Sequence, residues 1–360
     1  MPEIWLNYGK TDIVLDIRAE NLDEQVESQG KVLSDSEFAD KLDTLDISKP
    51  IELVVLNNSK SIQKTLLALF EKCEQKSTPK PQIYADKAIM NFVKSYLPEG
   101  ITISEFGNDE LSKSSLVFVG EMEFDGLFGF ETIATRLIKK FGKEEMLNAY
   151  NQRKGNLPAP GETLDNIQIA KKFSDSFEIK AIEIAANQKG PVDISIGHPA
   201  STMSISKTFG DSVSKEVEKH RTMMISTGKD ASNDSLSKSL ASLWNCNTAI
   251  KDNGLAVLLA ECKNGIGSDA IQQFIEGRMS LDRLKKPAKY VDGMEDLLFL
   301  TEVQKRFQIG LVSILPEFYT KKLNITSFAG IKRAMDHILK VQGVKQKVAI
   351  VSDGARILLR

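Results

Sequence analysis

Short apolar runs in this chain are followed by turns that carry lysine, serine and glycine. In a parallel α/β sheet, the loops at the carboxyl ends of strands present free backbone N–H groups, and helix N-termini add partial positive charge. Lysine side chains beside such groups bind small carboxylates or phosphates. The sequence therefore predicts a small-anion site built from three strand-end loops. Its candidate ligand-binding residues are Asn58, Lys60, Ser226, Gly228, Lys229, Glu261, Gly265 and Gly267.

Two residues are candidates for acid–base catalysis, Asp125 and His198. Asp125 lies between Phe124 and Gly126, where burial would make its carboxylate a usable base, but an exposed turn aspartate is the alternative. His198 follows an apolar strand in a tight loop, the position at which α/β proteins bind ligands. A histidine whose ring bonds to the backbone also fits that loop. Catalytic roles stay open for both residues.

Sequence motifs for nucleotide, metal and nucleic-acid binding are missing. The chain has no G-x-x-x-x-G-K-[ST] motif and no G-x-G-x-x-G motif after a strand. Its histidines, His198, His220 and His337, are far apart and form no H-E-x-x-H spacing. His220 falls in a charged segment, 215–221, where a solvated helix is expected. We therefore expect no metal site and no nucleic-acid partner.

Length and composition are those of a globular protein. The 360 residues suffice for two cores, with 41% hydrophobic residues, 27% charged residues and a formal net charge of −2. This balance gives no overall attraction to nucleic acid or to an anionic membrane. No apolar run reaches the roughly 18 residues that a membrane span needs, so no membrane partner is expected. The three cysteines form no C-x-x-C pair, which predicts a reducing, cytoplasmic location.

Strand and helix patterns alternate along the chain, which predicts an α/β fold with largely parallel sheets flanked by helices. A hairpin is expected at residues 4–17 and one long helix at 131–150. Another helix, with Leu236, Leu240 and Leu243 on one face, is expected to end at Asn253-Gly254. Further strands are expected at 51–56, near 83 and 101, and at 116–119, 179–184, 192–196, 223–225, 255–260, 309–314 and 348–351.

The charged segment before the apolar strand at 223–225 predicts a boundary between two domains. The expected N-terminal domain is residues 1–217 and the expected C-terminal α/β domain is residues 218–346, with a cleft between them. Residues 347–360 are expected to return to the first domain, because their end is apolar enough to dock there. The sequence does not indicate the oligomeric state.

Several short motifs resemble those of one known family. Tyr8-Gly9-Lys10 and Phe128-Gly129-Phe130 lie in the first half of the chain. A loop with Cys262, Gly265 and Gly267 and the segment 311–316 (Leu-Val-Ser-Ile-Leu-Pro) lie in the second half. In their order and spacing these motifs are similar to those of the nickel-pincer lactate racemase family.

That resemblance implies a two-domain fold and a nickel-pincer nucleotide held covalently by a lysine. It also implies histidines that bind nickel and move the hydroxyl proton of a 2-hydroxy acid. The position of the lysine is Thr135, that of the nickel-ligand histidine is Ala149, and that of one acid–base histidine is Asp125. The second acid–base histidine is missing near Asp86, and the substrate arginine falls on Ser61. The resemblance thus implies a divergent member that has lost the nickel-pincer site, and no cofactor is expected.

Three functions remain open from the sequence. The first is a pseudoenzyme that keeps the racemase-like fold and binds a small carboxylate or phosphate, or acts as a regulatory or partner-binding protein. The alternative is an enzyme related to 2-hydroxy-acid racemases and epimerases that uses a different mechanism in the same interdomain cleft. An active nickel-dependent racemase is supported by the family resemblance only.

Overall fold

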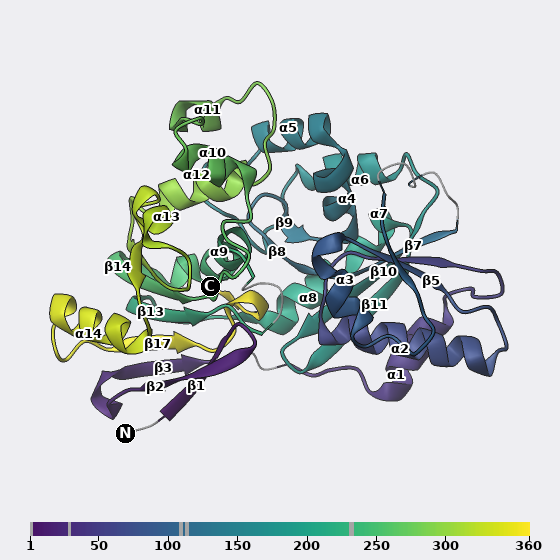
Figure 1. Cartoon of the computed structure of the whole chain (residues 1–360), viewed down its shortest axis with the longest axis horizontal. Helices are drawn as coiled ribbons and strands as arrows, with labels where there is room; N and C mark the ends of the chain where they lie inside the picture. Colours follow the sequence, from purple (N-terminus) through teal and green to yellow (C-terminus); the bar gives the residue numbers. More distant parts are fainter. Residues whose placement is uncertain (1–2, 28–29, 108–110, 112–114, 230–233) are drawn as a thin grey trace.

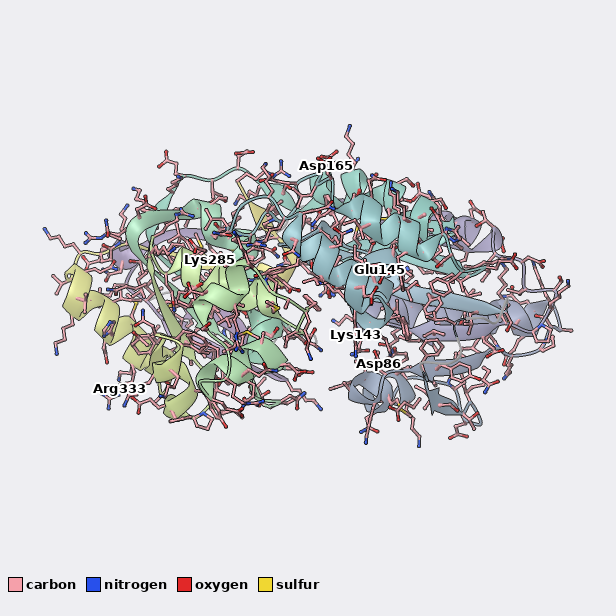
Figure 2. All side chains as sticks on the ribbon, turned by 90° about the horizontal axis from the view of Figure 1, so that it is seen from above. Asp86, Lys143, Glu145, Asp165, Lys285 and Arg333 are labelled. Carbon is pink, nitrogen blue, oxygen red and sulfur yellow. The ribbon has the colours of Figure 1, made fainter. Side chains whose placement is uncertain are left out.

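A computed structural model of the chain contains two separate six-stranded sheets (Figure 1). It describes residues 3–27, 30–107, 111, 115–229 and 234–360. Each sheet carries its own helices, and the view from above shows two bodies side by side (Figure 2). The labelled Asp86, Lys143 and Glu145 lie on one body, and Lys285 and Arg333 lie on the other. The predicted α/β class with largely parallel sheets is confirmed.

The first sheet has the strand order β11-β10-β7-β4-β5-β6 and is parallel except for the β10–β11 hairpin. Its four inner strands are largely buried because their apolar residues are covered on both faces, as in most parallel sheets. The strands are β4 (Glu52–Val55), β5 (Gln82–Ala85), β6 (Ile103–Glu105), β7 (Leu116–Glu121), β10 (Lys180–Asn187) and β11 (Gly190–Gly197). Its helices are α1 (Asp35–Asp43), α2 (Lys60–Gln75), α3 (Lys87–Lys94), α4 (Ile133–Phe141), α5 (Lys143–Asn151), α6 (Ile167–Ser174), α7 (Pro199–Thr202) and α8 (Ser206–Val213). We call this sheet with its helices the first body.

The second sheet has the order β16-β15-β14-β13-β17-β3 and is wholly parallel. Its strands are β3 (Leu22–Val26), β13 (His220–Ser226), β14 (Ile250–Leu259), β15 (Gln308–Val312), β16 (Thr326–Phe328) and β17 (Val348–Val351). Its helices are α9 (Leu236–Cys246), α10 (Asp269–Ile275), α11 (Leu281–Lys285), α12 (Met294–Val303), α13 (Glu317–Lys322) and α14 (Ile331–Gln342). The N-terminal hairpin, β1 (Glu3–Tyr8) and β2 (Thr11–Asp16), shares a hydrophobic cluster with this sheet and α14. We call this assembly the second body.

The N-terminal strands therefore belong to the second sheet. β3 hydrogen-bonds in parallel to β17, and Ile4, Leu6 and Leu15 pack with Met224 of β13. The predicted domain of residues 1–217 grouped these strands with the first sheet, whereas the structure places them with the second sheet. A local pattern cannot show that a strand will pair with a partner more than 300 residues away.

Two predicted helix boundaries were wrong. The helix expected at 131–150 is two helices, because Gly142 ends α4 and begins α5 with a non-helical backbone (φ −103°, ψ 69°). The helix that begins at Leu236 ends at Cys246, and Asn253 and Gly254 lie within β14. Asn253 has a left-handed φ of 59° beside a register shift between β13 and β14, so the pair marks an irregular strand.

His220 also differs from expectation. It is the first residue of β13 and is buried rather than solvated on a helix. Its Nδ1 lies 2.8 Å from Asp23 Oδ2, and its Nε2 lies 3.7 Å from Glu24 Oε2. Both carboxylates belong to β3, whose pairing in the second sheet was not foreseen.

The last residues of the chain pack against both bodies. β18 (Leu358–Leu359) pairs with β12 (Ser214–Lys215), which connects the bodies. Leu358 packs in a cluster with Phe124 and Phe209 of the first body, whereas Ile357 and Leu359 pack in the main cluster of the second body. No helix in the described part of the chain is long and apolar enough to cross a membrane. The cytoplasmic location stays a prediction.

Candidate functional site

The turn of the N-terminal hairpin lies against two of the predicted strand-end loops. Ser226 ends β13, and its Oγ donates to the carbonyl oxygen of Asn7 at 2.8 Å. Gly9 adopts a left-handed φ of 61°, and a Cβ at this position would lie 2.2 Å from Glu261 Oε2. The hairpin turn thus contacts the loops that follow β13 and β14. We call residues 7–10 together with residues 226–229 and 261–267 the turn site.

The remaining predicted residues of these two loops shape the turn site. The Gly228 N–H donates to Ser226 Oγ at 3.3 Å, and Lys229 forms a 3.1 Å ion pair with Asp12 of β2. Gly265 and Gly267 have left-handed φ angles of 76° and 71°. These contacts fix two strand-end loops beneath one turn.

Two lysines of the turn site converge on one aromatic ring of the first body. Lys10 Nζ lies 5.4 Å from the ring centroid of Phe92 on α3, and Lys263 Nζ lies 5.3 Å from the same centroid. Lys263 also forms a 3.0 Å ion pair with the buried Asp234. Among the described residues, no carboxylate lies within ion-pair distance of Lys10. The turn site therefore presents positive charge where the bodies meet.

Tyr8 and Cys262 stay protonated in the turn site. Burial raises the pKa of the Tyr8 phenol, and the negative charge of Glu261 raises it further. Burial also raises the pKa of the Cys262 thiol, whose Sγ lies 3.6 Å from Ser239 Oγ. A protonated phenol can donate a hydrogen bond, whereas a protonated, buried thiol is a poor nucleophile.

Asn58 and Lys60 lie at the start of α2 in the first body. Between them, Ser59 caps α2 by accepting from the Ile62 N–H at 3.1 Å, and its Oγ donates to Glu121 at 2.5 Å. Lys60 is exposed. No contact among the described residues joins Asn58 or Lys60 to the turn site.

The same Glu121 carboxylate connects the first body to the end of the chain. It terminates β7 and pairs with Arg356 Nη2 at 2.9 Å. Arg356 follows β17, the neighbour of β13 in the second sheet. The carboxyl ends of strands from both sheets are therefore connected through one buried ion pair.

Asp125 is buried rather than an exposed turn residue, and both of its carboxylate oxygens accept hydrogen bonds. Its Oδ1 accepts the N–H groups of Leu127 at 2.7 Å and Phe128 at 2.6 Å, and its Oδ2 lies 2.5 Å from Lys139 Nζ. Lys139 also pairs with Glu131 at 2.9 Å. Burial alone would lower the pKa of Lys139, but Asp125 and Glu131 raise it well above its usual value. Lys139 therefore stays protonated and cannot act as a base, and three of the four lone-pair sites of the Asp125 carboxylate are occupied.

His198 is held by the backbone. Its Nδ1 accepts the Ala200 N–H at 3.3 Å as the N-cap of α7, and its Nε2 lies 3.2 Å from the Phe177 carbonyl oxygen. Asp175 lies 3.7 Å from Nδ1. These contacts match the alternative in which the backbone holds this histidine, and no contact within the described residues joins it to the turn site.

The positions that the resemblance assigns to the cofactor do not fit a nickel-pincer nucleotide. Thr135 is fully buried, and its Oγ1 accepts the Thr132 N–H at 2.7 Å in the capping box of α4. Ala149 is buried in a hydrophobic cluster and has no side-chain donor atom. Throughout the described ranges, no group of three His, Cys, Asp or Glu side chains is arranged to hold a metal ion.

Glu183 should make the stability of the first body depend on pH. It is fully buried, and burial raises its pKa to about 7, although hydrogen bonds from the Ile133 N–H oppose the shift. A carboxyl with a raised pKa stabilises the folded state below its unfolded pKa, and this contribution is lost as the pH rises through about 7. The loss is about 3 kcal/mol.

Glu183→Gln should therefore flatten the pH dependence of stability. The amide oxygen of glutamine can still accept the Ile133 N–H, but the side chain does not titrate. Urea unfolding between pH 5 and pH 8 should show wild type losing about 3 kcal/mol more than the variant. Parallel pH curves for the two proteins would contradict this expectation.

The sequence did not identify five residues that the structure brings to the turn site: Tyr8, Lys10, Phe92, Asp234 and Lys263. Tyr8 and Lys10 belong to a motif that was noted only for its resemblance and its turn. Phe92 and Asp234 carried no signal, because their roles depend on contacts between the bodies and between loops. Lys263 lies in a predicted strand-end loop, but this lysine was not among the candidate residues.

Comparisons with known proteins identify the fold. No family model and no curated protein match the sequence. The lactate racemase apoprotein from Thermoanaerobacterium thermosaccharolyticum superposes with a TM-score of 0.69 at 14% identity, covering all of both chains. A protein from Thermotoga maritima superposes with a TM-score of 0.65 at 10% identity, covering 93% of this chain and all of that one. The chain therefore has a lactate-racemase-like fold.

Proposed function

We propose that this protein binds a small carboxylate or phosphate at the turn site and does not carry out nickel-pincer chemistry. The observation that carries the proposal is the convergence of Lys10 and Lys263 on the ring of Phe92. Two ammonium groups near one ring repel each other, and an anion between them would remove that repulsion. Lys10 is the stronger attachment point, because it has no carboxylate partner among the described residues.

The surroundings of the two lysines favour a small organic anion. A carboxylate can pair with Lys10 while the neutral Tyr8 hydroxyl donates a hydrogen bond. The apolar part of the same molecule can rest on the Phe92 ring, which a fully hydrated inorganic ion cannot use. Glu261 and Asp234 limit the net positive charge, so we expect monoanions to bind better than polyanions.

The absence of nickel-pincer chemistry is supported by the residues at the corresponding positions. Thr135 offers no amine for covalent attachment, and Ala149 offers no metal ligand. Lys139 is the nearest lysine in sequence, but its ion pairs with Asp125 and Glu131 keep it protonated. The local bonding of Asp125 and His198 likewise favours a binding function over acid–base catalysis by a different mechanism.

Isothermal titration calorimetry with L-lactate, D-lactate and inorganic phosphate would test the proposal. We expect at least one lactate enantiomer to bind, and a Lys10→Ala/Lys263→Ala variant to bind it at least 10-fold more weakly, since charge-assisted bonds contribute about 1.5–3 kcal/mol each. Lys285→Ala, on the exposed surface of α11, is the matched control and should not change the affinity.

Two results would contradict the proposal. The first is unchanged lactate affinity in the double variant, which would move the anion site elsewhere. The second is a covalent adduct in the intact mass of protein co-expressed with cofactor-assembling enzymes. Such an adduct would show that another residue attaches a nickel-pincer nucleotide.

A further inference from the structure

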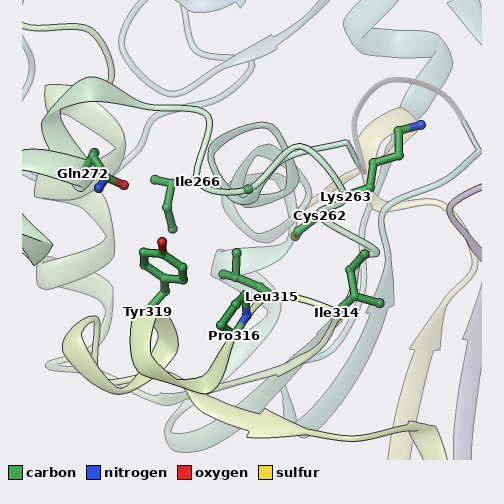
Figure 3. A pocket seen from close by; sticks show the side chains of 9 residues that line it. Cys262, Lys263, Ile266, Gln272, Ile314, Leu315, Pro316 and Tyr319 are labelled. Atoms are coloured by element: carbon green, nitrogen blue, oxygen red, sulfur yellow. The ribbon is translucent and has the colours of Figure 1, made fainter.

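A pocket of about 310 Å³ lies where β14 and β15 end in the second sheet (Figure 3). The two strands pair at Leu259 and Val312, so the loops that follow them are neighbours. Backbone hydrogen bonds hold both loops: Gly265 N–H to the Cys262 carbonyl at 3.0 Å, and Ile314 N–H to the Glu261 carbonyl at 3.2 Å. The pocket is therefore preformed at the edge where parallel sheets bind ligands.

The lining combines an apolar wall with two hydrogen-bonding groups. Ile266, Leu315 and Pro316 provide the apolar wall. Figure 3 shows the amide oxygen of Gln272 and the hydroxyl of Tyr319 both directed toward Ile266. These two polar groups converge at one end of the pocket.

The hydrogen-bonding capacity left on Gln272 and Tyr319 determines which ligand groups fit the pocket. Gln272 Nε2 donates to Glu276 Oε1 at 2.6 Å, which leaves its Oε1 free to accept. Within the described part of the chain, the Tyr319 hydroxyl has no hydrogen-bond partner. A ligand group that donates an N–H or O–H to Gln272 and pairs with Tyr319 would satisfy both.

The pocket contains no free charge. Lys263 contributes to the lining, but its ammonium group points away from the other lining side chains (Figure 3). It is held outside by Asp234 at 3.0 Å and by the ring of Phe92. A carboxylate in the pocket would face the Gln272 oxygen without a cation, so an anion is disfavoured.

We infer that this pocket binds an uncharged small molecule with a ring or branched apolar body and a terminal N–H or O–H donor. It is a second site, separate from the anion at the turn site, although both share the loop 261–267. The volume is at the lower end of the roughly 300–1,000 Å³ range of small-molecule sites, which fits a single ring with one polar group.

Benzamide is a suitable probe, and benzoate is its charged analogue of equal size. We expect calorimetry on the full chain at neutral pH to show saturable benzamide binding that is several-fold tighter than benzoate binding. Tyr319→Phe, which keeps every ring atom, should weaken benzamide binding about threefold to tenfold. Tyr319→Phe combined with Gln272→Leu should weaken it at least 10-fold.

Two controls separate this site from the anion site. Gln273→Leu makes the same substitution one residue along α10, and Lys10→Ala removes a turn-site cation; neither should change benzamide affinity. The inference fails if benzamide shows no saturable binding up to its solubility limit, if benzoate binds more tightly, or if Tyr319→Phe leaves the affinity unchanged. If the wild-type protein binds benzamide but neither lactate enantiomer, the proposed function is refuted and this site still stands.

Discussion

Lys139→Met should lower the free energy of unfolding by about 3–5 kcal/mol, because it leaves the buried Asp125 carboxylate without its cation and Glu131 with Arg136 alone. Lys139 Nζ lies 2.5 Å from Asp125 Oδ2 and 2.9 Å from Glu131 Oε1, and methionine preserves most of the side-chain volume. The charges of Lys139 and Arg136 lower the pKa of Glu131, so this carboxyl is ionised at neutral pH. Urea unfolding at pH 7 measures the change.

Two further variants show whether charge is the cause. Lys143→Met, at an exposed lysine of α5, should change stability by less than about 0.5 kcal/mol. Asp125→Asn in the Lys139→Met background should recover part of the loss, because one unpaired charge is removed. A loss below about 1 kcal/mol for Lys139→Met would mean that water reaches the cluster and that its ion pairs contribute as surface pairs do.

Local patterns were sufficient to predict most strands of both sheets. Continuous apolar runs such as 116–119 and 348–351 became fully buried parallel strands, because such runs fit a sheet that is covered on both faces. The break at Gly142 was missed because the apolar periodicity continues across it and a single glycine is tolerated in many helices. β3 was not predicted as a strand, because Leu22–Val26 has apolar residues only at its two ends.

Only the part of the candidate site that the loops of the second sheet form was predictable from the sequence. Strand-end loops at 226–229 and 261–267 follow from the fold class, since the carboxyl ends of parallel strands share one edge. Their partners come from distant segments: Ser226 bonds to Asn7, and Lys263 lies over Phe92. The burial of Asp125 was likewise beyond a local pattern, because its cation, Lys139, lies on the following helix.

Leu358→Ala should destabilise the protein by about 2–5 kcal/mol and separate the unfolding of the two bodies. Successive side chains of a strand point to opposite faces, so β18 can insert into both bodies at once. Leu358 packs with Phe124 and Phe209 of the first body, and Ile357 and Leu359 pack in the second. Calorimetric scanning should show one transition for wild type and two for the variant.

Because neighbouring side chains of this segment pack in different bodies, each substitution should lower a different unfolding transition. Ile357→Ala should cost a similar free energy but lower the transition of the second body, whereas Leu358→Ala should lower that of the first. Val344→Ala, at a side chain that is 74% exposed, should change neither transition by more than about 0.5 kcal/mol. If Leu358→Ala unfolds in one transition at an unchanged temperature, the terminal strand does not couple the bodies. In that case the Arg356–Glu121 ion pair and the contacts of Lys10 and Lys263 with Phe92 would be sufficient to hold them together.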